Sequence, residues 1–312
     1  MMAFLFPGQG SQYAGMGKEL SGKYPEFRRV MEEADDTLKF SLSKLCFDGP
    51  DDQLKLTAIT QPSILSVSTG IWEIMKRRAP LPRFAAGHSL GEYTALVSAG
   101  SLQFRDAVQT VKHRGEFMQE AVPEGRGSMA AILGLRADEV DDICSEASKG
   151  EIVSAANYNS PVQTVVAGEA GAVERVIELA GKRGAKRALK LQVSAPFHCA
   201  LMKPAQEKLA AHLETVAMAD LAFPIVTNVD ARFVSEGRQA KDSLVRQVTA
   251  PVRWEQSMKL LRQEGTELLV EIGPKKVLSG LARQIDESFR ICNVEDERSL
   301  VQILKVLEPV RC

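Results

Sequence analysis

Short apolar runs alternate along the chain with longer segments whose apolar residues recur every three or four positions. The short runs predict buried strands, and the longer segments predict amphipathic helices. Strands that alternate with helices are typical of an α/β fold with a mostly parallel sheet. The predicted strands are residues 3–6, 84–86, 223–228, 267–272 and 291–294, and the predicted helices are residues 24–45, 63–78, 104–121, 204–216, 254–263 and 300–307, with Pro62 beside the first turn of the second helix.

The pattern changes at the glycine-rich stretch 125–127. The segment that follows predicts elements in the order βαββαβ, which is the ferredoxin-like arrangement. We therefore expect a small ferredoxin-like domain at 125–197, inserted into a large catalytic domain formed by 1–124 and 198–312, with hinges at 125–127 and 194–196. The predicted elements of the insert are strands at 129–135, 152–157, 163–167 and 187–193 and helices at 138–148 and 170–183.

A Gly-His-Ser-Leu-Gly sequence joins the strand at 84–86 to a helical pattern that ends at Gly100. This is the pattern of a nucleophile elbow, in which a serine, here Ser89, lies on a sharp strand-to-helix turn. The backbones approach so closely in such a turn that the flanking Gly87 and Gly91 must lack a Cβ. The first amides of the helix face the group that the serine attacks, where they can stabilise an oxyanion. An ordinary serine in a glycine-flanked turn is the alternative.

A glycine-rich loop follows the first strand at residues 7–12. It is not a P-loop, because no Gly-Lys-Ser/Thr follows it. Two uses of this loop stay open at this point. It can cradle a phosphate, or an amide near Gln9 can supply a second oxyanion donor.

Arg114 falls on the apolar stripe of the helix predicted at 104–121, three residues after Val111 and four before Met118. A buried guanidinium needs an acidic partner, because an unpaired buried charge is strongly destabilising. That partner is either a structural Asp or Glu, or the carboxylate of a substrate held by the planar fork through two hydrogen bonds.

The chain has four histidines, of which His198 is the best candidate for a general base. His88 precedes the elbow serine, so its side chain should point away from that of Ser89. His113 lies off the apolar stripe of its helix, and His212 lies in a predicted amphipathic helix. His198 follows the insert at a domain junction, where clefts form. A structural histidine is the alternative.

Composition and charge exclude few function classes. The chain has 312 residues, of which 45% are hydrophobic and 25% charged, and its net charge of −1 favours neither nucleic acid nor a membrane surface as a partner. No apolar run has the length of a membrane-spanning helix, and the N-terminus lacks the basic region of a signal peptide. The cysteines are not at metal-ligand or redox spacing, so we expect no metal and reduced thiols in a cytoplasmic protein. They are Cys46, Cys144, Cys199, Cys292 and Cys312.

Six segments, in order along nearly the whole chain, resemble the malonyl-CoA:acyl carrier protein transacylase family. They are Phe-Pro-Gly-Gln-Gly-Ser-Gln at 6–12, Gly-His-Ser-Leu-Gly-Glu-Tyr at 87–93, Arg114, Ser-Ala-Pro-Phe-His at 194–198, Leu-Val-Arg-Gln-Val at 244–248 and Glu-Ile-Gly-Pro at 271–274. The resemblance implies an α/β-hydrolase-like large domain with a ferredoxin-like insert, in agreement with the pattern above.

The resemblance also implies roles for single residues. Ser89 would be the nucleophile and His198 the base, oriented by the backbone carbonyl of Gln247 and not by an acid. Arg114 would bind the malonyl carboxylate. The remaining implied residues are Gln9 and Leu90, whose amides would form the oxyanion hole, and Gln61, Asn157, Phe197 and Met118 near the pocket, where Phe197 would crowd a branched group such as methylmalonyl.

The implied reaction is ping-pong transfer of malonyl from malonyl-CoA to the phosphopantetheine thiol of acyl carrier protein in fatty-acid synthesis, by a cytoplasmic monomer without a cofactor. The alternatives are an acyltransferase that serves a polyketide synthase, a malonate-decarboxylase transacylase, a serine thioesterase or esterase, and a silent scaffold that only binds carrier proteins. A thioesterase normally has a late histidine. Here the last histidine is His212.

A basic cluster lies near the end of the insert. The cluster is either a solvated edge, because helix C-termini favour cations, or a docking surface for the acidic carrier protein or the phosphates of CoA. Its members are Lys182, Arg183, Lys186, Arg187 and Lys190.

Overall fold

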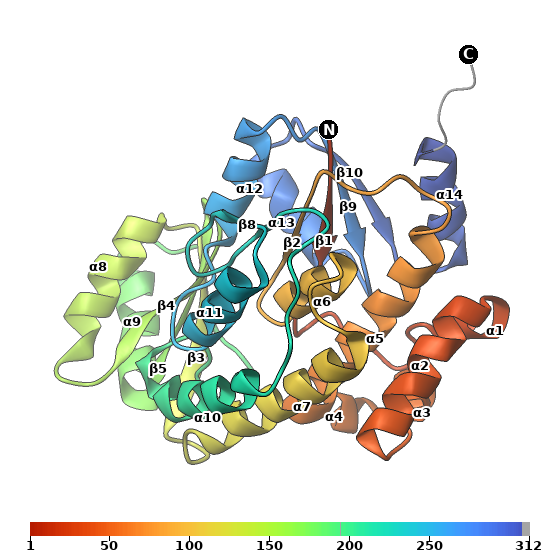
Figure 1. The fold of residues 1–312 in the computed structure, drawn as a ribbon. Helices are drawn as coiled ribbons and strands as arrows, with labels where there is room; N and C mark the ends of the chain where they lie inside the picture. The colour runs from red at the N-terminus through yellow and green to blue at the C-terminus, as the bar shows by residue number, and fades with distance from the viewer. Residues whose placement is uncertain (194, 308–312) are drawn as a thin grey trace.

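A six-stranded sheet forms the centre of the computed structural model, which describes residues 1–193 and 195–307 (Figure 1). Its strand order is β10-β9-β1-β2-β7-β8, and all neighbours are parallel except the β7–β8 pair. The mostly parallel sheet predicted from the sequence is therefore confirmed. The strands are β1 (Met2–Phe6), β2 (Phe84–Gly87), β7 (Ile225–Val226), β8 (Phe233–Val234), β9 (Leu268–Ile272) and β10 (Arg290–Val294).

Helices cover both faces of this sheet, because successive side chains of a strand point to opposite faces. In β1, Ala3 and Leu5 pack with α12 and α13. Phe4 and Phe6 lie in the larger core on the other face. The helices of the large domain are α1 (Lys18–Lys23), α2 (Pro25–Leu38), α3 (Leu42–Asp48), α4 (Asp51–Leu54), α5 (Thr57–Met75), α6 (Gly91–Ser98), α7 (Phe104–Glu120), α10 (Lys203–Glu214), α11 (Gly237–Gln247), α12 (Trp254–Gln263), α13 (Val277–Ile285) and α14 (Glu297–Leu307), with a short 3₁₀ turn at Ala200–Met202.

Two helix predictions were wrong in their bounds. The single helix expected at 24–45 is interrupted at Lys39, whose φ of 62° is left-handed and ends α2 before α3 begins. The helix expected to start at 63 begins at Thr57, so Pro62 lies inside α5 and not at its first turn. A proline lacks the N–H that a helix interior would use, yet surrounding packing retains the helix here. The strand expected at 223–228 is reduced to the two residues of β7.

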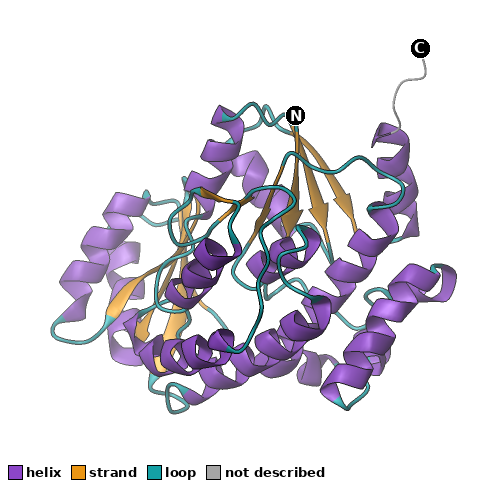
Figure 2. Cartoon of the chain, viewed as in Figure 1, coloured by secondary structure: helices purple, strands orange, loops and turns teal. Residues whose placement is uncertain are grey.

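A second, four-stranded sheet forms the small unit at the left of Figures 1 and 2. Its order is β4-β5-β3-β6 with antiparallel neighbours, which is the ferredoxin-like arrangement predicted from the sequence. Helices α8 and α9 cover one face. The other face, with Met129 and Ala131, packs toward the large domain. The elements are β3 (Gly127–Leu133), α8 (Ala137–Ser148), β4 (Val153–Ser160), β5 (Gln163–Glu169), α9 (Ala170–Lys182) and β6 (Arg187–Lys190).

Backbone and side-chain hydrogen bonds join β4 of the small unit to the large one. Val252 donates to the carbonyl of Ala156 and accepts from the amide of Tyr158, both at 2.9 Å. Ser160 donates to Gln284 at 2.8 Å. The boundaries at 125 and 197 stay a prediction, and Ser194 of the expected hinge and Cys312 lie outside the described residues. Within the described ranges, no helix has both the length and the apolar character needed to cross a membrane.

Candidate active site

The elbow predicted at Ser89 forms between β2 and α6. Ser89 has a φ of 52°, in the left-handed region that costs energy for a residue with a side chain. A Cβ on Gly87 would lie 1.9 Å from the carbonyl oxygen of Gly91, and a Cβ on Gly91 would lie 2.0 Å from the carbonyl oxygen of Phe6. Both glycines are therefore required by backbone contact, as the sequence predicted.

Ser89, His198 and Gln247 form one hydrogen-bonded line. Ser89 Oγ lies 2.7 Å from His198 Nε2, and His198 Nδ1 lies 2.8 Å from the backbone oxygen of Gln247. Because a carbonyl oxygen only accepts, Nδ1 carries the hydrogen and Nε2 is left to accept the serine proton. The expected carbonyl partner is thus at the expected place. His198 also has a left-handed backbone, with a φ of 59°.

Arg114 reaches the same point from α7. Its Nη2 donates to Ser89 Oγ at 3.1 Å and to Gln247 Oε1 at 2.9 Å, while Nη1 donates to Gln61 Oε1 at 2.8 Å. The approach of α7 to α5 depends on Gly115, since a Cβ there would lie 2.7 Å from the Cα of Ala58. Within residues 1–193 and 195–307, no carboxylate oxygen lies within 4.0 Å of the guanidinium nitrogens.

The glycine-rich loop at 7–12 lies against the elbow. The amide of His88 donates to the carbonyl of Phe6 at 3.0 Å, and a Cβ on Gly8 would lie 2.5 Å from the carbonyl oxygen of His88. This contact brings Gln9 beside the turn that carries Leu90. Among the described residues, the amides of Gln9 and Leu90 have no backbone acceptor outside the regular elements.

Gln9 and Asn157 line a cleft of about 410 Å³ between the two units. His88 also lines it, and the remaining wall comes from the loop at 7–12, Lys55, β3, β4, β5, residues 191–193 and α13. Ser89, His198 and Arg114 are not among the described residues that line this cleft. Met118 joins the site at the other end, where its Sδ lies 3.9 Å from Gln61 Nε2. Phe197 is buried next to His198. Six of the predicted site residues thus form a connected series of direct contacts, namely Ser89, His198, Arg114, Gln247, Gln61 and Met118. The other four lie at the margins of this group, namely Gln9, Leu90, Asn157 and Phe197.

Comparison with known proteins agrees with this geometry. The acyl transferase domain family matches residues 3–303. The malonyl CoA-acyl carrier protein transacylase of Bacillus subtilis strain 168 is 46% identical over 98% of this chain and 97% of its own length. That of Escherichia coli K12 is 43% identical over 97% and 99%. The chain belongs to the malonyl CoA-acyl carrier protein transacylase family.

Solved structures of this family superpose closely on the protein. One of these structures is the complex of a type II polyketide synthase acyl carrier protein with its malonyl-transacylase. The matching chain in it is 44% identical, with a TM-score of 0.96 over 98% of this chain and 99% of that one. The acyl carrier protein S-malonyltransferase of Vibrio cholerae is 42% identical, with a TM-score of 0.95 over 97% and 99%. The α/β fold expected from the sequence, with a mostly parallel sheet in the large part and a separate ferredoxin-like sheet, is confirmed.

Electrostatics of this transacylase site favour a neutral base. Burial, followed by the positive charge of Arg114, lowers the pKa of His198 to about 3. The imidazole therefore holds no proton at Nε2 around neutral pH, as a general base requires. Burial also lowers the pKa of His88, whose Nε2 lies 2.9 Å from Asn159 Oδ1 of β4. His88 thus points away from Ser89, toward the small unit, as predicted.

Sequence reasoning missed two residues under the elbow. Asn228 accepts from the amide of Ser89 at 2.6 Å and donates to the carbonyl of Gly87 at 2.7 Å. Glu92 is fully buried and accepts from the Asn228 amide at 3.0 Å and from Gln247 Nε2 at 2.8 Å. The sequence signals for Glu92 were a carboxylate within the apolar start of α6 and its place in the segment 87–93 that resembles the family. Nothing local linked it to Asn228.

Ion pairs neutralise much of the basic cluster at the end of the small unit. Three of its five cations form ion pairs with carboxylates. The pairs are Lys182 with Glu178, Arg183 with Glu146, and Lys190 with Glu174. Lys186 and Arg187 have no such partner within the described ranges. They line a hollow of about 250 Å³ that shares Gln163 with the cleft between the two units.

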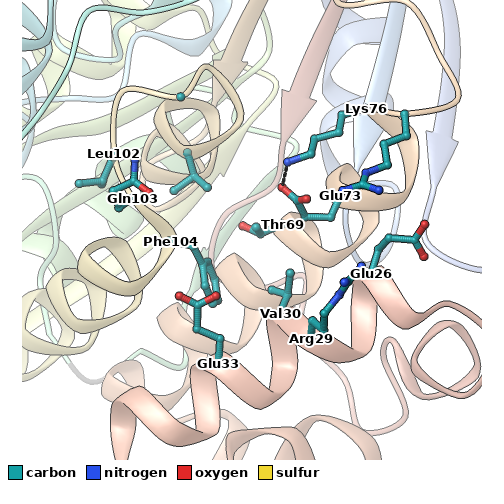
Figure 3. Close-up of a pocket in the computed structure, with 13 residues that line it drawn as sticks. Glu26, Arg29, Val30, Glu33, Thr69, Glu73, Lys76, Leu102, Gln103 and Phe104 are labelled. Atoms are coloured by element: carbon teal, nitrogen blue, oxygen red, sulfur yellow. Dashed lines mark hydrogen bonds and ion pairs between the residues drawn. The ribbon is translucent and has the colours of Figure 1, made fainter.

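A separate hollow of about 380 Å³ lies between α2, α5 and the start of α7, and it carries charged side chains such as Glu33, Glu73 and Lys76 (Figure 3). None of the predicted site residues lines it. The described cysteines are free thiols, as expected, and the pKa values of the thiols of Cys46, Cys144 and Cys199 are raised by burial. These thiols are poor nucleophiles for that reason.

Proposed function

We propose that the protein transfers the malonyl group of malonyl-CoA to the phosphopantetheine thiol of an acyl carrier protein through an ester on Ser89. The environment of Arg114 carries this proposal. The guanidinium is buried, donates to Ser89 Oγ and otherwise to neutral amide oxygens. A buried cation in contact with the nucleophile fits an acyl group that brings its own carboxylate. Thioesters of uncharged acids bring no carboxylate into contact with that cation.

In the first half-reaction His198 Nε2 takes the proton of Ser89 Oγ, which attacks the thioester carbon. The carbonyl oxygen becomes an oxyanion facing the amides of Gln9 and Leu90, and each such donor contributes roughly 10²–10³ in rate. The C–S bond then breaks. The CoA thiolate takes the proton from His198 and leaves a malonyl ester on Ser89.

In the second half-reaction the phosphopantetheine thiol gives its proton to His198 and attacks the ester carbon. The second tetrahedral intermediate expels Ser89 Oγ, which regains the proton from His198. The carboxylate of the malonyl group lies on Arg114 throughout. It also offsets the positive charge that lowers the pKa of His198, so the base becomes stronger when the correct acyl group is bound.

Fatty-acid synthesis is the pathway we propose for this transfer, in the cytoplasm and by a monomer without a cofactor. A polyketide synthase carrier is the second candidate. It is favoured by the 44% identity to a malonyl-transacylase in complex with a type II polyketide synthase acyl carrier protein. The ratio of kcat/KM for purified fatty-acid and polyketide carriers separates the two candidates.

The test of the transfer is incubation with malonyl-CoA and carrier protein in its holo form, with the apo form as the matched control. We expect malonyl-carrier and free CoA in equal amounts with the holo form only. Release of malonate at the same rate with either form would identify a thioesterase instead.

A further inference from the structure

Glu92 lies fully buried beneath the elbow, in the first turn of α6. Its Oε2 accepts two hydrogen bonds, from the backbone amide of Asn228 at 3.0 Å and from Gln247 Nε2 at 2.8 Å. Its Oε1 has no hydrogen-bond partner among the described residues. Burial of a carboxylate costs free energy unless the group is paired and hydrogen-bonded.

The side-chain amide of Gln247 lies between Glu92 and Arg114. Its Nε2 faces the carboxylate, and its Oε1 accepts from Arg114 Nη2 at 2.9 Å. The negative end of the amide dipole thus faces the cation and the positive end faces the anion, so each bond polarises the other. The same Nε2 donates to the carbonyl of Ser89 at 3.0 Å, and the backbone oxygen of Gln247 accepts from His198.

Asn228, the other group held by Glu92, braces the elbow itself. Its side chain bridges the carbonyl of Gly87 at 2.7 Å and the amide of Ser89 at 2.6 Å. These two bonds cross the turn in which Ser89 has its left-handed backbone. One carboxylate therefore touches both the brace of the nucleophile and the residue that orients the base and Arg114.

We propose that Glu92 is a positioning residue that, through Gln247 and Asn228, holds Ser89, His198 and Arg114 in one arrangement and is the resident counter-charge of Arg114 until a malonyl carboxylate takes its place. The inference rests on the proposed malonyl transfer. It predicts that the arriving carboxylate and the ionised Glu92 compete for the same positive charge. Discrimination between malonyl and acetyl groups then depends on the ionisation of Glu92.

Glu92 titrates within the pH range in which the enzyme can be assayed. Burial raises its pKa to about 7, against the hydrogen bonds of Asn228 and Gln247 and the charge of Arg114 from α7. The other ionisable groups that face it are Asp230, in the turn after β7, and Tyr93 on its own helix.

Neither neighbour titrates near neutral pH. Asp230 accepts two hydrogen bonds from Arg246, which lower its pKa, and burial raises the pKa of Tyr93. The pKa of His198, at about 3, is also far from this range. A change in selectivity near pH 7 would therefore report Glu92.

Linkage between proton binding and malonyl binding sets the direction in which pH changes malonyl affinity. A malonyl carboxylate beside Arg114 cancels the charge that favours ionised Glu92, so the pKa of Glu92 rises when malonyl binds. Malonyl then binds best when Glu92 is protonated, below the pKa of the free enzyme, and binding weakens as pH rises through 7. Acetyl carries no carboxylate and gives no such dependence.

The test measures the rate constant of Ser89 acylation, kcat/KM, with malonyl-CoA and with acetyl-CoA from about pH 6 to about pH 9, because this quantity reports the free enzyme. Both donors carry the same CoA phosphates, so their titration cancels in the ratio. We expect the malonyl-to-acetyl ratio to fall above pH 7, by up to about tenfold per pH unit. In Glu92→Gln, which keeps an acceptor for both N–H groups but no charge, we expect a flat ratio.

The positioning role is tested by the contrast between Glu92→Ala and Glu92→Gln. We expect the alanine variant to lose about tenfold or more in kcat with both donors, and the glutamine variant to recover most of that loss. Wild-type kcat in the alanine variant would overturn the positioning role. If the malonyl-to-acetyl ratio of kcat/KM had the same pH dependence in wild type and in Glu92→Gln, the role of Glu92 as a counter-charge would be overturned.

The wild-type enzyme alone keeps the inference open to refutation if the variants do not fold. Equal pH dependence of the two donors in wild type contradicts the inference while the malonyl ester still forms. Absence of the ester at every pH would instead contradict the proposed function, so the two failures are distinguishable.

Discussion

Replacement of Arg114 by alanine is the sharpest perturbation of selectivity that the site offers. Arg114 is 2% exposed, and its guanidinium makes three hydrogen bonds, one of them to the nucleophile. Without it, a malonyl carboxylate would enter a buried site with no cation. Leaving one partner of a buried ion pair uncompensated costs about 3–5 kcal/mol. That loss corresponds to roughly 10²–10⁴ in kcat/KM for malonyl-CoA.

Acetyl transfer should respond differently to the same change. Acetyl has no carboxylate to lose, and removal of Arg114 removes a charge that lowers the pKa of His198. The base is then stronger, so acetyl transfer should hold or rise. The assay compares acylation of Ser89 by malonyl-CoA and acetyl-CoA in wild type and in Arg114→Ala.

Two control variants separate charge from geometry and from folding. Arg114→Lys keeps the charge and loses the fork, so we expect it to recover malonyl transfer only in part. Arg105→Ala removes an exposed arginine from the same helix and should change neither donor. Equal loss of malonyl and acetyl transfer in Arg114→Ala, in a protein that still folds, would refute the role of Arg114.

Three further changes test other parts of the account. Lys186→Glu with Arg187→Glu should raise the KM for carrier protein several-fold and leave acylation by malonyl-CoA unchanged. Among the described residues these two cations have no carboxylate partner, and they line a hollow that shares Gln163 with the cleft between the two units. Steady-state kinetics with each substrate varied decides this. Phe197→Ala should raise the rate with methylmalonyl-CoA relative to malonyl-CoA, and an unchanged ratio would remove Phe197 from the specificity determinants. Gly115→Ala forces a Cβ to within 2.7 Å of Ala58, so α7 must shift and the KM for malonyl-CoA should rise more than that for acetyl-CoA.

Two of these changes have a control. The control for the charge reversal at Lys186 and Arg187 is Lys182→Glu with Arg183→Glu. Both of these residues are already ion-paired, so their reversal should raise the KM for carrier protein less. A KM that rises equally in the two double variants would point to general attraction and not to a docking contact. For Gly115 the control is thermal unfolding, because a fall in Tm without a change in the KM ratio would mean that Arg114 kept its place.

Local sequence was enough to predict the residues whose roles depend on their immediate neighbours. The elbow at Ser89 was predictable because both flanking glycines are imposed by close backbone contacts, that of Gly87 with Gly91 in the same turn and that of Gly91 with Phe6 at the end of β1. Arg114 was visible because a charge on an apolar helical stripe is unusual. The expected carbonyl of Gln247 followed from the family resemblance, since no local pattern joins it to His198.

Long-range contacts explain what was missed. Asn228 and Ser89 are 139 residues apart, and Glu92 and Gln247 are 155 residues apart, so no periodicity links them. The strand β7 has two residues because its pairing with β2 covers only Ala85 and Ala86. The break at Lys39 was hidden because the apolar positions of α2 and α3 happen to continue at helical spacing.

The most direct test of the central claim is the intact mass of the protein after brief mixing with malonyl-CoA, with Ser89→Ala as the control. We expect a malonyl adduct that requires Ser89, persists in buffer and disappears when holo carrier protein is added. An adduct that is lost rapidly to water without carrier, or no adduct with malonyl-CoA, would contradict the account.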